Sequence, residues 1–377
     1  MNETLVRLRK ELHQHPELSG EERATAKRIV EFVKEFHPTD IIENIGGEGV
    51  AVIYKFGNDG PTVAIRCELD ALPIVEENTF SYQSKNIGIS HKCGHDGHMA
   101  IVAGLSMWLA EAQFKKGSVV LLFQPAEETG KGAAKMLADA KFRKLAPDYV
   151  FALHNLPGQK MHSILVKPDY FTATVQSLCI QLKGKKAHAS EPENGVNPTL
   201  ATAELIQLLA TFANPNFESD DFALLTPVCI DIGEKNYGIS PENAEIHYTI
   251  RTWNGQIMIE LEDNIKEAVD VVAKKHQLKY DIDWFEFFPA SDNNIECVKW
   301  VEKVAAQKRL ELKRINSPLR FGEDFGWFSQ HYKSAIFGLG AGEQHPSLHH
   351  VDYDFPDDLI DTGTTMFKGL ITEILGD

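Results

Sequence analysis

The first part of the chain alternates short apolar runs with helical patterns. Three runs are almost wholly apolar and predict strands buried on both faces, at residues 62–66, 118–123 and 149–153. Between them, apolar residues recur at helical spacing and predict helices over 99–113 and 132–138. This order predicts an α/β fold with a mixed, mostly parallel sheet that carries helices on both faces.

The pattern changes near residue 171, where apolar and polar residues begin to alternate as in strands with one exposed face. The expected order is strand, helix, two strands, helix, strand, over 172–184, 199–212, 223–233, 244–253, 257–275 and 278–287. We therefore expect an inserted α+β domain of ferredoxin-like order at 171–284. Residues 1–170 and 285–377 would then form one catalytic domain, completed by a buried strand at 333–339.

Composition narrows the possible partners. The 377 residues carry a formal net charge of −16, so the overall field repels nucleic acid and anionic membrane surfaces. No window approaches the run of about 18 apolar residues that a membrane helix needs, and the first residues lack the apolar core of a signal peptide. Five scattered cysteines do not form a disulfide framework. We expect a cytoplasmic protein.

Chemically capable side chains follow each of the three buried strands. Asp70 comes after the first, Glu127 and Glu128 after the second, and His154 after the third. In open α/β sheets the ligand lies beyond the carboxyl ends of the strands, so we expect these side chains to meet in one crevice. The stretch HKCGHDGH at 91–98 adds sulfur and nitrogen donors.

This mixed donor set suits Zn²⁺, Mn²⁺, Ni²⁺ or Co²⁺ better than Mg²⁺ or Ca²⁺, which prefer oxygen alone. The candidates exceed the three protein ligands of a typical mononuclear catalytic zinc site, so the sequence predicts two ions. Adjacent Glu127 and Glu128 point in different directions from a strand end. One can therefore bind metal while the other takes a proton from a water that the metal acidifies.

Five motifs together resemble the aminoacylase-type metallopeptidases, in their amidohydrolase branch. They are ELHQHPELSGEE at 11–22, DALP at 70–73, HKCGHDGH at 91–98, QPAEE at 124–128 and LHHVDYDF at 348–355. The branch includes N-acyl-amino-acid deacylases, hippurate hydrolase and N-acetyldiaminopimelate deacetylase. The resemblance implies metal-dependent hydrolysis of the amide bond in N-acyl amino acids or related small acylated amines.

The resemblance also implies individual roles. Glu127 would be the general base and Asp70 would orient a ligand histidine. His188 in GKKAHAS would stabilise the oxyanion, and Arg251 would bind the substrate carboxylate as a fork. The inserted domain would be a lid that also mediates a homodimer. The implied metal ligands, with the thiolate of the first bridging both ions, are Cys93, His95, Glu128, His154 and His349.

Two residues depart from the family pattern, and several alternatives stay open. Glu68 stands where the family has an aspartate, and Lys92 interrupts the metal motif, where its charge is expected to lower the pKa of Cys93. Motif order favours His349 over its neighbour His350 as ligand. A metallo-aminopeptidase or dipeptidase is the nearest alternative, and a catalytically inactive metal- or ligand-binding protein is an alternative of another class. The sequence does not specify the acyl group, the amino acid or the metal.

Overall fold

The computed structural model describes residues 3–376, which divide into two compact units. The first comprises residues 3–171, Ser291–Asn316 and 323–376, and the second comprises Thr172–Ala290 and Ser317–Gly322. The second unit extends past the expected boundary at 284 because its last strand, β13 (Lys279–Phe288), pairs with its neighbour as far as Phe288. Residues 317–322 join this unit because the Ala173 amide donates to the Leu319 carbonyl at 2.9 Å.

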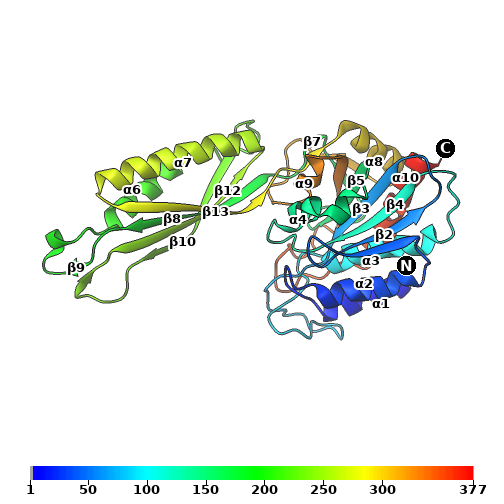
Figure 1. Ribbon diagram of the computed structural model, residues 1–377, viewed down its shortest axis with the longest axis horizontal. Helices are drawn as coiled ribbons and strands as arrows, with labels where there is room; N and C mark the ends of the chain where they lie inside the picture. Colours follow the sequence, from blue (N-terminus) through cyan, green and yellow to red (C-terminus); the bar gives the residue numbers. More distant parts are fainter. Residues whose placement is uncertain (1–2, 377) are drawn as a thin grey trace. The chain divides into compact units, whose positions relative to one another are not determined.

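An eight-stranded mixed sheet forms the centre of the first unit, in the order β1-β2-β4-β3-β5-β16-β6-β15 (Figure 1). The bounds are β1 Asp40–Ile45, β2 Gly49–Lys55, β3 Thr62–Glu68, β4 Ser118–Gln124, β5 Tyr149–Leu156, β6 Ile164–Val166, β15 Leu312–Arg314 and β16 Lys333–Gly340. The central strands β4, β3, β5 and β16 run parallel, whereas β1 and β2 add an antiparallel edge. Parallel pairing places the carboxyl ends of β3, β4 and β5 at one edge of the sheet.

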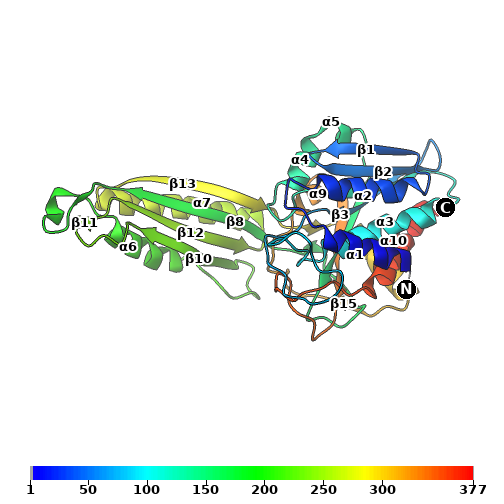
Figure 2. The same cartoon turned by 90° about the horizontal axis from the view of Figure 1, so that it is seen from below.

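Both faces of this sheet are covered, and the expected α/β fold is confirmed. In β4, Leu121 and Phe123 belong to the core under α3, whereas Val120 and Leu122 are equally buried and point to the other face. Short helices α4, α5 and α9 pack together away from that core (Figure 2). The helices of the unit are α1 Glu3–Gln14, α2 Arg23–Lys34, α3 His95–Leu109, α4 Gly132–Ala138, α5 Ala140–Arg143, α8 Ile295–Gln307, α9 Gly326–Ser329 and α10 Leu359–Leu375.

The second unit has its own antiparallel sheet, in the order β10-β12-β8-β13, with α6 and α7 on the same face (Figure 1). Its elements are β8 Thr174–Lys183, α6 Thr199–Ala210, β10 Ala223–Ile232, β12 Asn243–Thr252 and α7 Gly255–Lys275, followed by β13. The order of these elements along the chain and the order of the strands in the sheet are those of a ferredoxin-like fold. Leu178, Ile180 and Leu182 of β8 form its core with Ile265 and Val269 of α7.

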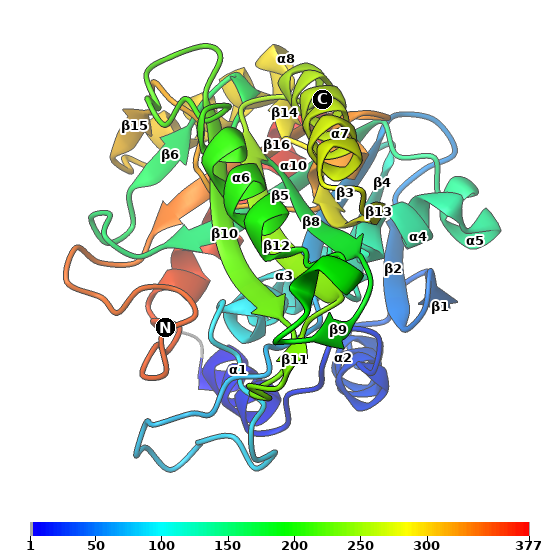
Figure 3. The same cartoon turned by 90° about the vertical axis from the view of Figure 1, so that its left-hand side faces the viewer.

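Smaller elements complete the two units. Strands β7 (Asp169–Tyr170) and β14 (Asp292–Asn293) pair in the first unit. In the second, β9 (Ala187–His188) pairs with β11 (Ile239–Ser240) beside the 3-10 helix η1 (Pro192–Asn194), as Figure 3 shows. Within residues 3–376, no helix is both long enough and apolar enough to cross a membrane.

Candidate metal and active site

The candidate metal-binding motif at 91–98 lies where a loop leads into α3. The helix begins at His95, four residues before the expected start, because Gly94 precedes it with φ of +98°. A Cβ atom at Gly94 would lie 2.5 Å from Asn155 Oδ1 and 2.9 Å from the Tyr353 hydroxyl. Glycine therefore provides both the backbone conformation and the space that bring Cys93 against β5.

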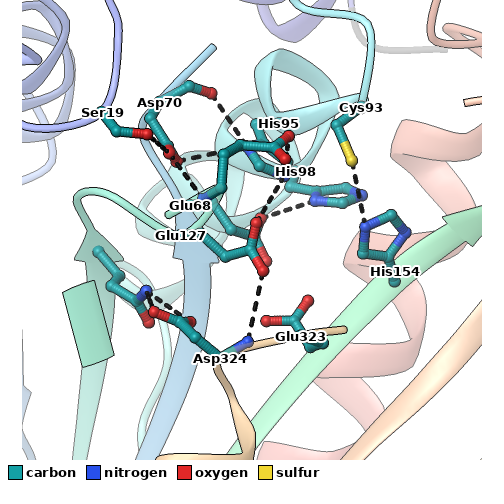
Figure 4. Close-up of polar contacts among 12 residues, drawn as sticks. Ser19, Glu68, Asp70, Cys93, His95, His98, Glu127, His154, Glu323 and Asp324 are labelled. Atoms are coloured by element: carbon teal, nitrogen blue, oxygen red, sulfur yellow. Dashed lines mark hydrogen bonds and ion pairs between the residues drawn. The ribbon is translucent and has the colours of Figure 1, made fainter. Parts of the chain in front are cut away.

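Two histidines, His95 and His154, direct their Nε2 atoms toward the same place beside Cys93. His95 Nδ1 donates to the Asp70 carbonyl oxygen and His154 Nδ1 donates to the Asn155 carbonyl oxygen, both at 2.9 Å. These bonds to acceptors fix the proton on Nδ1 and leave each Nε2 as the potential ligand atom. Cys93 Sγ lies 3.5 Å from His154 Nε2, and Figure 4 shows Cys93, His95 and His154 side by side.

Cys93 also belongs to a second group. The ligand atoms of Cys93, Glu128 and His349 lie within 4.8 Å of one another, as do those of Cys93, His95 and His154. His349 reaches this position because its amide donates to the Lys92 carbonyl and its backbone adopts φ of +65°. The structure thus brings together all five predicted ligands of the first unit, with Cys93 common to both groups.

His350, the open alternative to His349, lies elsewhere. Its Nδ1 contacts Asp352, and its side chain is exposed. His349 Nε2 instead lies 3.8 Å from Glu128 Oε2. The geometry therefore favours His349, in agreement with the order of the motif.

Two ligand-type atoms in the groups that share Cys93 are buried without a hydrogen-bond partner among residues 3–376, as expected of atoms that bind cations. They are His95 Nε2 and Glu128 Oε1. Burial raises the pKa of Glu128 to about 7, and burial together with Glu128 holds the pKa of the Cys93 thiol well above its usual range. A pair of divalent cations would satisfy these atoms and offset the concentrated negative charge, so the residues present fit the expected metal centre.

Glu127 is placed differently from the ligand candidates. Its Oε1 accepts the Asp324 amide at 3.3 Å, and its Oε2 lies 3.9 Å from His95 Nε2 (Figure 4). Burial, followed by the charges of Glu323 and Glu128, holds its pKa well above the usual range. A carboxylate of raised pKa beside a ligand cluster is suited to accept and return protons.

The N-terminal segment braces the two glutamates, which sequence reasoning did not anticipate. Glu22 Oε1 accepts the Ala126 amide at 2.7 Å, and Ala126 has φ of +52°. Asp70 Oδ2 accepts both the Ser19 hydroxyl at 2.7 Å and the Glu128 amide at 3.0 Å. Ser19 and Glu22 belong to the quoted motif at 11–22, whose acidic and hydroxyl residues were the available signal.

Glu68, which stands where the family has an aspartate, contacts His98 and Arg66. Its Oε2 accepts from His98 Nδ1 at 2.7 Å, and its Oε1 pairs with Arg66. His98 Nε2 is engaged by Asn155, so neither His98 nitrogen is left for a metal. Although Glu68, His95 and His98 also form a close group, two of its three members already have short hydrogen bonds.

Arg66 connects this network to the segment near residue 324, another contact that the sequence did not reveal. Its guanidinium lies 2.7 Å from Asp324 and 2.9 Å from Glu323. Gln124 donates to both Asp324 oxygens at 2.7 and 2.8 Å. Asp324 is therefore held so that its own amide points to Glu127.

The expected effect of Lys92 on Cys93 is wrong. Lys92 Nζ binds Glu76 at 2.6 Å and the Tyr353 carbonyl at 2.8 Å, so Glu76 balances its charge. The pKa of Cys93 is raised by burial and by Glu128 instead of lowered. Lys92 ties the metal motif to two loops of the first unit.

His188 and Arg251 belong to the second unit. The Ser190 amide donates to His188 Nδ1 at 3.1 Å, which requires an unprotonated Nδ1 and leaves Nε2 as a donor when the ring is neutral. Arg251, half-buried on β12, donates from Nη1 to the Arg320 carbonyl at 2.9 Å. Burial and the nearby Arg320 charge lower the pKa of Arg251. Their assigned roles at the substrate stay predictions.

An α/β sheet with paired carboxylates, imidazoles and a thiol at its carboxyl edge defines a hydrolase-type metal centre. The chain belongs to peptidase family M20/M25/M40, whose match spans residues 64–373. The expected family is thereby confirmed.

Two relatives and one solved structure resemble nearly the whole chain. Hippurate hydrolase from Campylobacter jejuni is 30% identical over 98% of this chain and 96% of its own. N-acetyl-L-cysteine deacetylase from Bacillus subtilis is 32% identical over 93% of this chain and 83% of its own. The crystal structure of a dinuclear metal-binding M20 peptidase from Bacillus subtilis aligns with a TM-score of 0.84 and 26% identity, over 99% of this chain and 98% of that one.

Proposed function

We propose that this protein hydrolyses the amide bond of N-acyl amino acids, or of related small acylated amines, with two divalent transition-metal ions bound. The observation that carries the proposal is Glu127, a buried carboxylate beside two groups of metal-type donors that share Cys93. A metal site that only stabilised the fold would have no use for this carboxylate. The named relatives hydrolyse small N-acylated amino acids, and this supports the same substrate class here.

We assign the two ions to Cys93, His95, Glu128, His154 and His349. Two bound divalent ions would supply Lewis acidity, which acidifies water and polarises the scissile carbonyl. Sulfur and nitrogen donors favour Zn²⁺, Mn²⁺, Ni²⁺ or Co²⁺ over harder ions. The hydrogen bonds from His95 to Asp70 and from His154 to Asn155 orient both imidazoles before any ion arrives.

Glu127 moves the proton in this scheme. It accepts a proton from the attacking water at its carboxylate and returns it to the leaving nitrogen when the amide bond breaks. Its raised pKa favours holding that proton between the two steps. The Asp324 amide fixes the carboxylate while Arg66 and Gln124 fix Asp324.

The second unit supplies the substrate contacts in this proposal. Arg251 and Arg320 bring two guanidinium groups together, and a carboxylate would relieve their mutual repulsion. This supports Arg251 as the group that binds the carboxylate of the amino acid. His188, with its Nε2 available as a donor, stabilises the oxyanion.

Glu127→Gln tests the central assignment. It should lower kcat on N-acyl amino acids by at least about 10³-fold while the bound metal stays near the wild-type amount. Glu128→Gln is the matched comparison, since it should lose both metal and activity. Metal analysis and steady-state kinetics on the same preparations distinguish the two. If Glu127→Gln also lost metal, the role of base would be refuted.

A substrate screen tests the class. N-acetyl, N-benzoyl and N-succinyl amino acids should be cleaved after each of the four ions is restored in turn, whereas free dipeptides should be poor substrates. Preferential cleavage of dipeptides would favour the aminopeptidase alternative, and metal binding without any cleavage would favour an inactive binding protein. The cytoplasmic location and the homodimer formed through the second unit stay predictions.

A further inference from the structure

The sheet of the second unit carries two thiols and an imidazole on the face opposite α6 and α7. Cys179 lies between Leu178 and Ile180, which form the core on the helix side, so its side chain points to the other face. Register places Cys179 opposite His247 of β12, and His247 opposite Cys229 of β10. The result is a row of thiol, imidazole and thiol across three adjacent strands.

Distances within this row are short. Cys179 Sγ lies 3.7 Å from His247 Nε2, and His247 Nε2 lies 3.4 Å from Glu245 Oε2. The ligand-type atoms of Cys179, His247 and Glu245 all lie within 4.8 Å of one another. Glu245 shares the face because it lies two residues before His247 on the same strand.

The two cysteines are not arranged for a disulfide. Strand β12 separates β8 from β10, and neighbouring strands lie about 4.8 Å apart, so their Cα atoms are about 9–10 Å apart. A disulfide requires Cα atoms less than about 7 Å apart. Cys179 and Cys229 therefore flank the imidazole of His247 instead of pairing with each other.

Charge on this face favours a cation. Asp283 of β13 is opposite Cys179, and Asp231 of β10 is opposite Glu245. Burial and then the charges of Glu245 and Asp283 raise the pKa of Cys179. Lys183 and Lys279 lie beyond Glu245 along the strands, farther from Cys179 and His247. The carboxylates are therefore the charges nearer to these two side chains.

We propose that Cys179, His247 and Glu245 form a third metal site, with Cys229 positioned to complete it as a fourth ligand. Thiolate, imidazole and carboxylate together select a thiophilic divalent ion, for which Zn²⁺ is the best match. Each thiol releases its proton when it binds the ion. The site lies wholly within the second unit and uses none of the residues assigned to hydrolysis.

Metal stoichiometry tests this site. After equilibrium dialysis against Zn²⁺, the full chain should bind one more equivalent than a Cys179→Ser, His247→Ala double variant. Thr249→Ala is the matched control, because Thr249 shares the face and strand of His247 but is not a ligand type. Equal zinc content in the wild type and the double variant would overturn the proposal.

Cobalt absorption separates this site from the candidate catalytic centre, which contains another thiol. A full-length Cys93→Ser variant should still show near-ultraviolet thiolate-to-Co²⁺ absorption, and adding Cys179→Ser and Cys229→Ser should abolish it. If Cys93→Ser lacked this absorption, the third site would be refuted. That result would have no bearing on the proposed hydrolase function.

A third measurement needs no variant of the site itself. Cys229 is exposed, so its reaction with a disulfide reagent can be followed in the intact wild-type chain. Zn²⁺ at about ten times its dissociation constant should slow that reaction about tenfold. An unchanged rate at saturating Zn²⁺ would show that Cys229 is not a ligand.

Discussion

Glu22 illustrates how a residue outside the ligand set positions the candidate site. It is fully buried, and one of its oxygens accepts the amides of Gly20 at 2.8 Å and Ala126 at 2.7 Å. Ala126 has a positive φ and directly precedes Glu127. Burial raises the pKa of Glu22 to about 7, which means that a neutral acceptor is tolerated at this position.

Glu22→Gln should therefore retain most of the activity, because the amide oxygen can accept the same two hydrogen bonds. Glu22→Ala should lower the free energy of unfolding by about 1–3 kcal/mol, since two amides lose their partner. It should also lower kcat, because the backbone that aims Glu127 is released. Urea denaturation and kinetics on both variants measure the two effects. Equal loss of activity in Glu22→Gln and Glu22→Ala would contradict a positioning role through hydrogen bonds.

At the scale of elements, the junction between the metal motif and α3 depends on Gly94. The helix starts directly after this residue, and His95 is its first member. The conformation at Gly94 lets Cys93 approach His154 while His95 faces Asp70. A helix that began at residue 99, as the periodicity predicted, would leave His95 in a loop without this orientation.

Gly94→Ala should destabilise the fold and reduce metal content. The left-handed backbone costs a non-glycine residue about 1–2 kcal/mol, and the new methyl group would clash with Asn155 and Tyr353. Gly88→Ala is a matched control, because Gly88 also has positive φ, +85°, but no atom lies within 4 Å of its added Cβ. Thermal unfolding and metal analysis should show the larger loss in Gly94→Ala. Equal losses in the two variants would exclude the steric contribution.

At the scale of the whole molecule, a buried charged network joins distant parts of the first unit. His13 of α1 contacts Asp96 of α3 at 2.8 Å and Glu76 at 2.9 Å. Arg9 lies 2.7 Å from Asp354, near the end of the chain. Burial opposes protonation of His13, but its hydrogen bonds to Asp96 and Glu76 raise its pKa from 6.5 to about 9.

This network predicts a pH window for stability. The pKa of His13 is raised, so its contribution is fully present below pH 6.5 and is lost as pH rises through about 9. Burial alone would raise the pKa of Glu76, but hydrogen bonds from His13 and Lys92 lower it from 4.5 to about 2, so this contribution is lost as pH falls through about 2. Both contributions are complete between pH 4.5 and 6.5.

His13→Gln should lower the free energy of unfolding by about 2 kcal/mol at pH 6 and by much less at pH 10. Chemical denaturation of wild type and variant at both pH values measures the difference. The exposed His331 provides a control, because His331→Gln should have little effect at either pH. A His13→Gln penalty that stayed constant up to pH 10 would contradict the linkage.

Local patterns in the sequence determined the strands of the central sheet and the chemistry at their ends. The apolar runs at 62–66, 118–123 and 149–153 predicted β3, β4 and β5, because a strand buried on both faces requires apolar residues throughout. The residue types at Cys93, Glu127 and their neighbours likewise indicated metal-binding and proton-transfer chemistry. The antiparallel edge of β1 and β2 was not predicted. The residues of β1 are mostly exposed or half-buried and partly polar, whereas β2 is a buried apolar run that was not included among the predicted strands.

Only the tertiary structure decided which atoms face one another. The contacts of Glu22 with Ala126, of Arg66 with Asp324 and of His13 with Asp96 join residues 83 to 258 positions apart. The row of Cys179, His247 and Cys229 likewise depends on strand register. Local sequence specifies the period of an element and the donors it carries. Long-range pairing of strands and burial of charge specify which donors meet, and these depend on the folded chain as a whole.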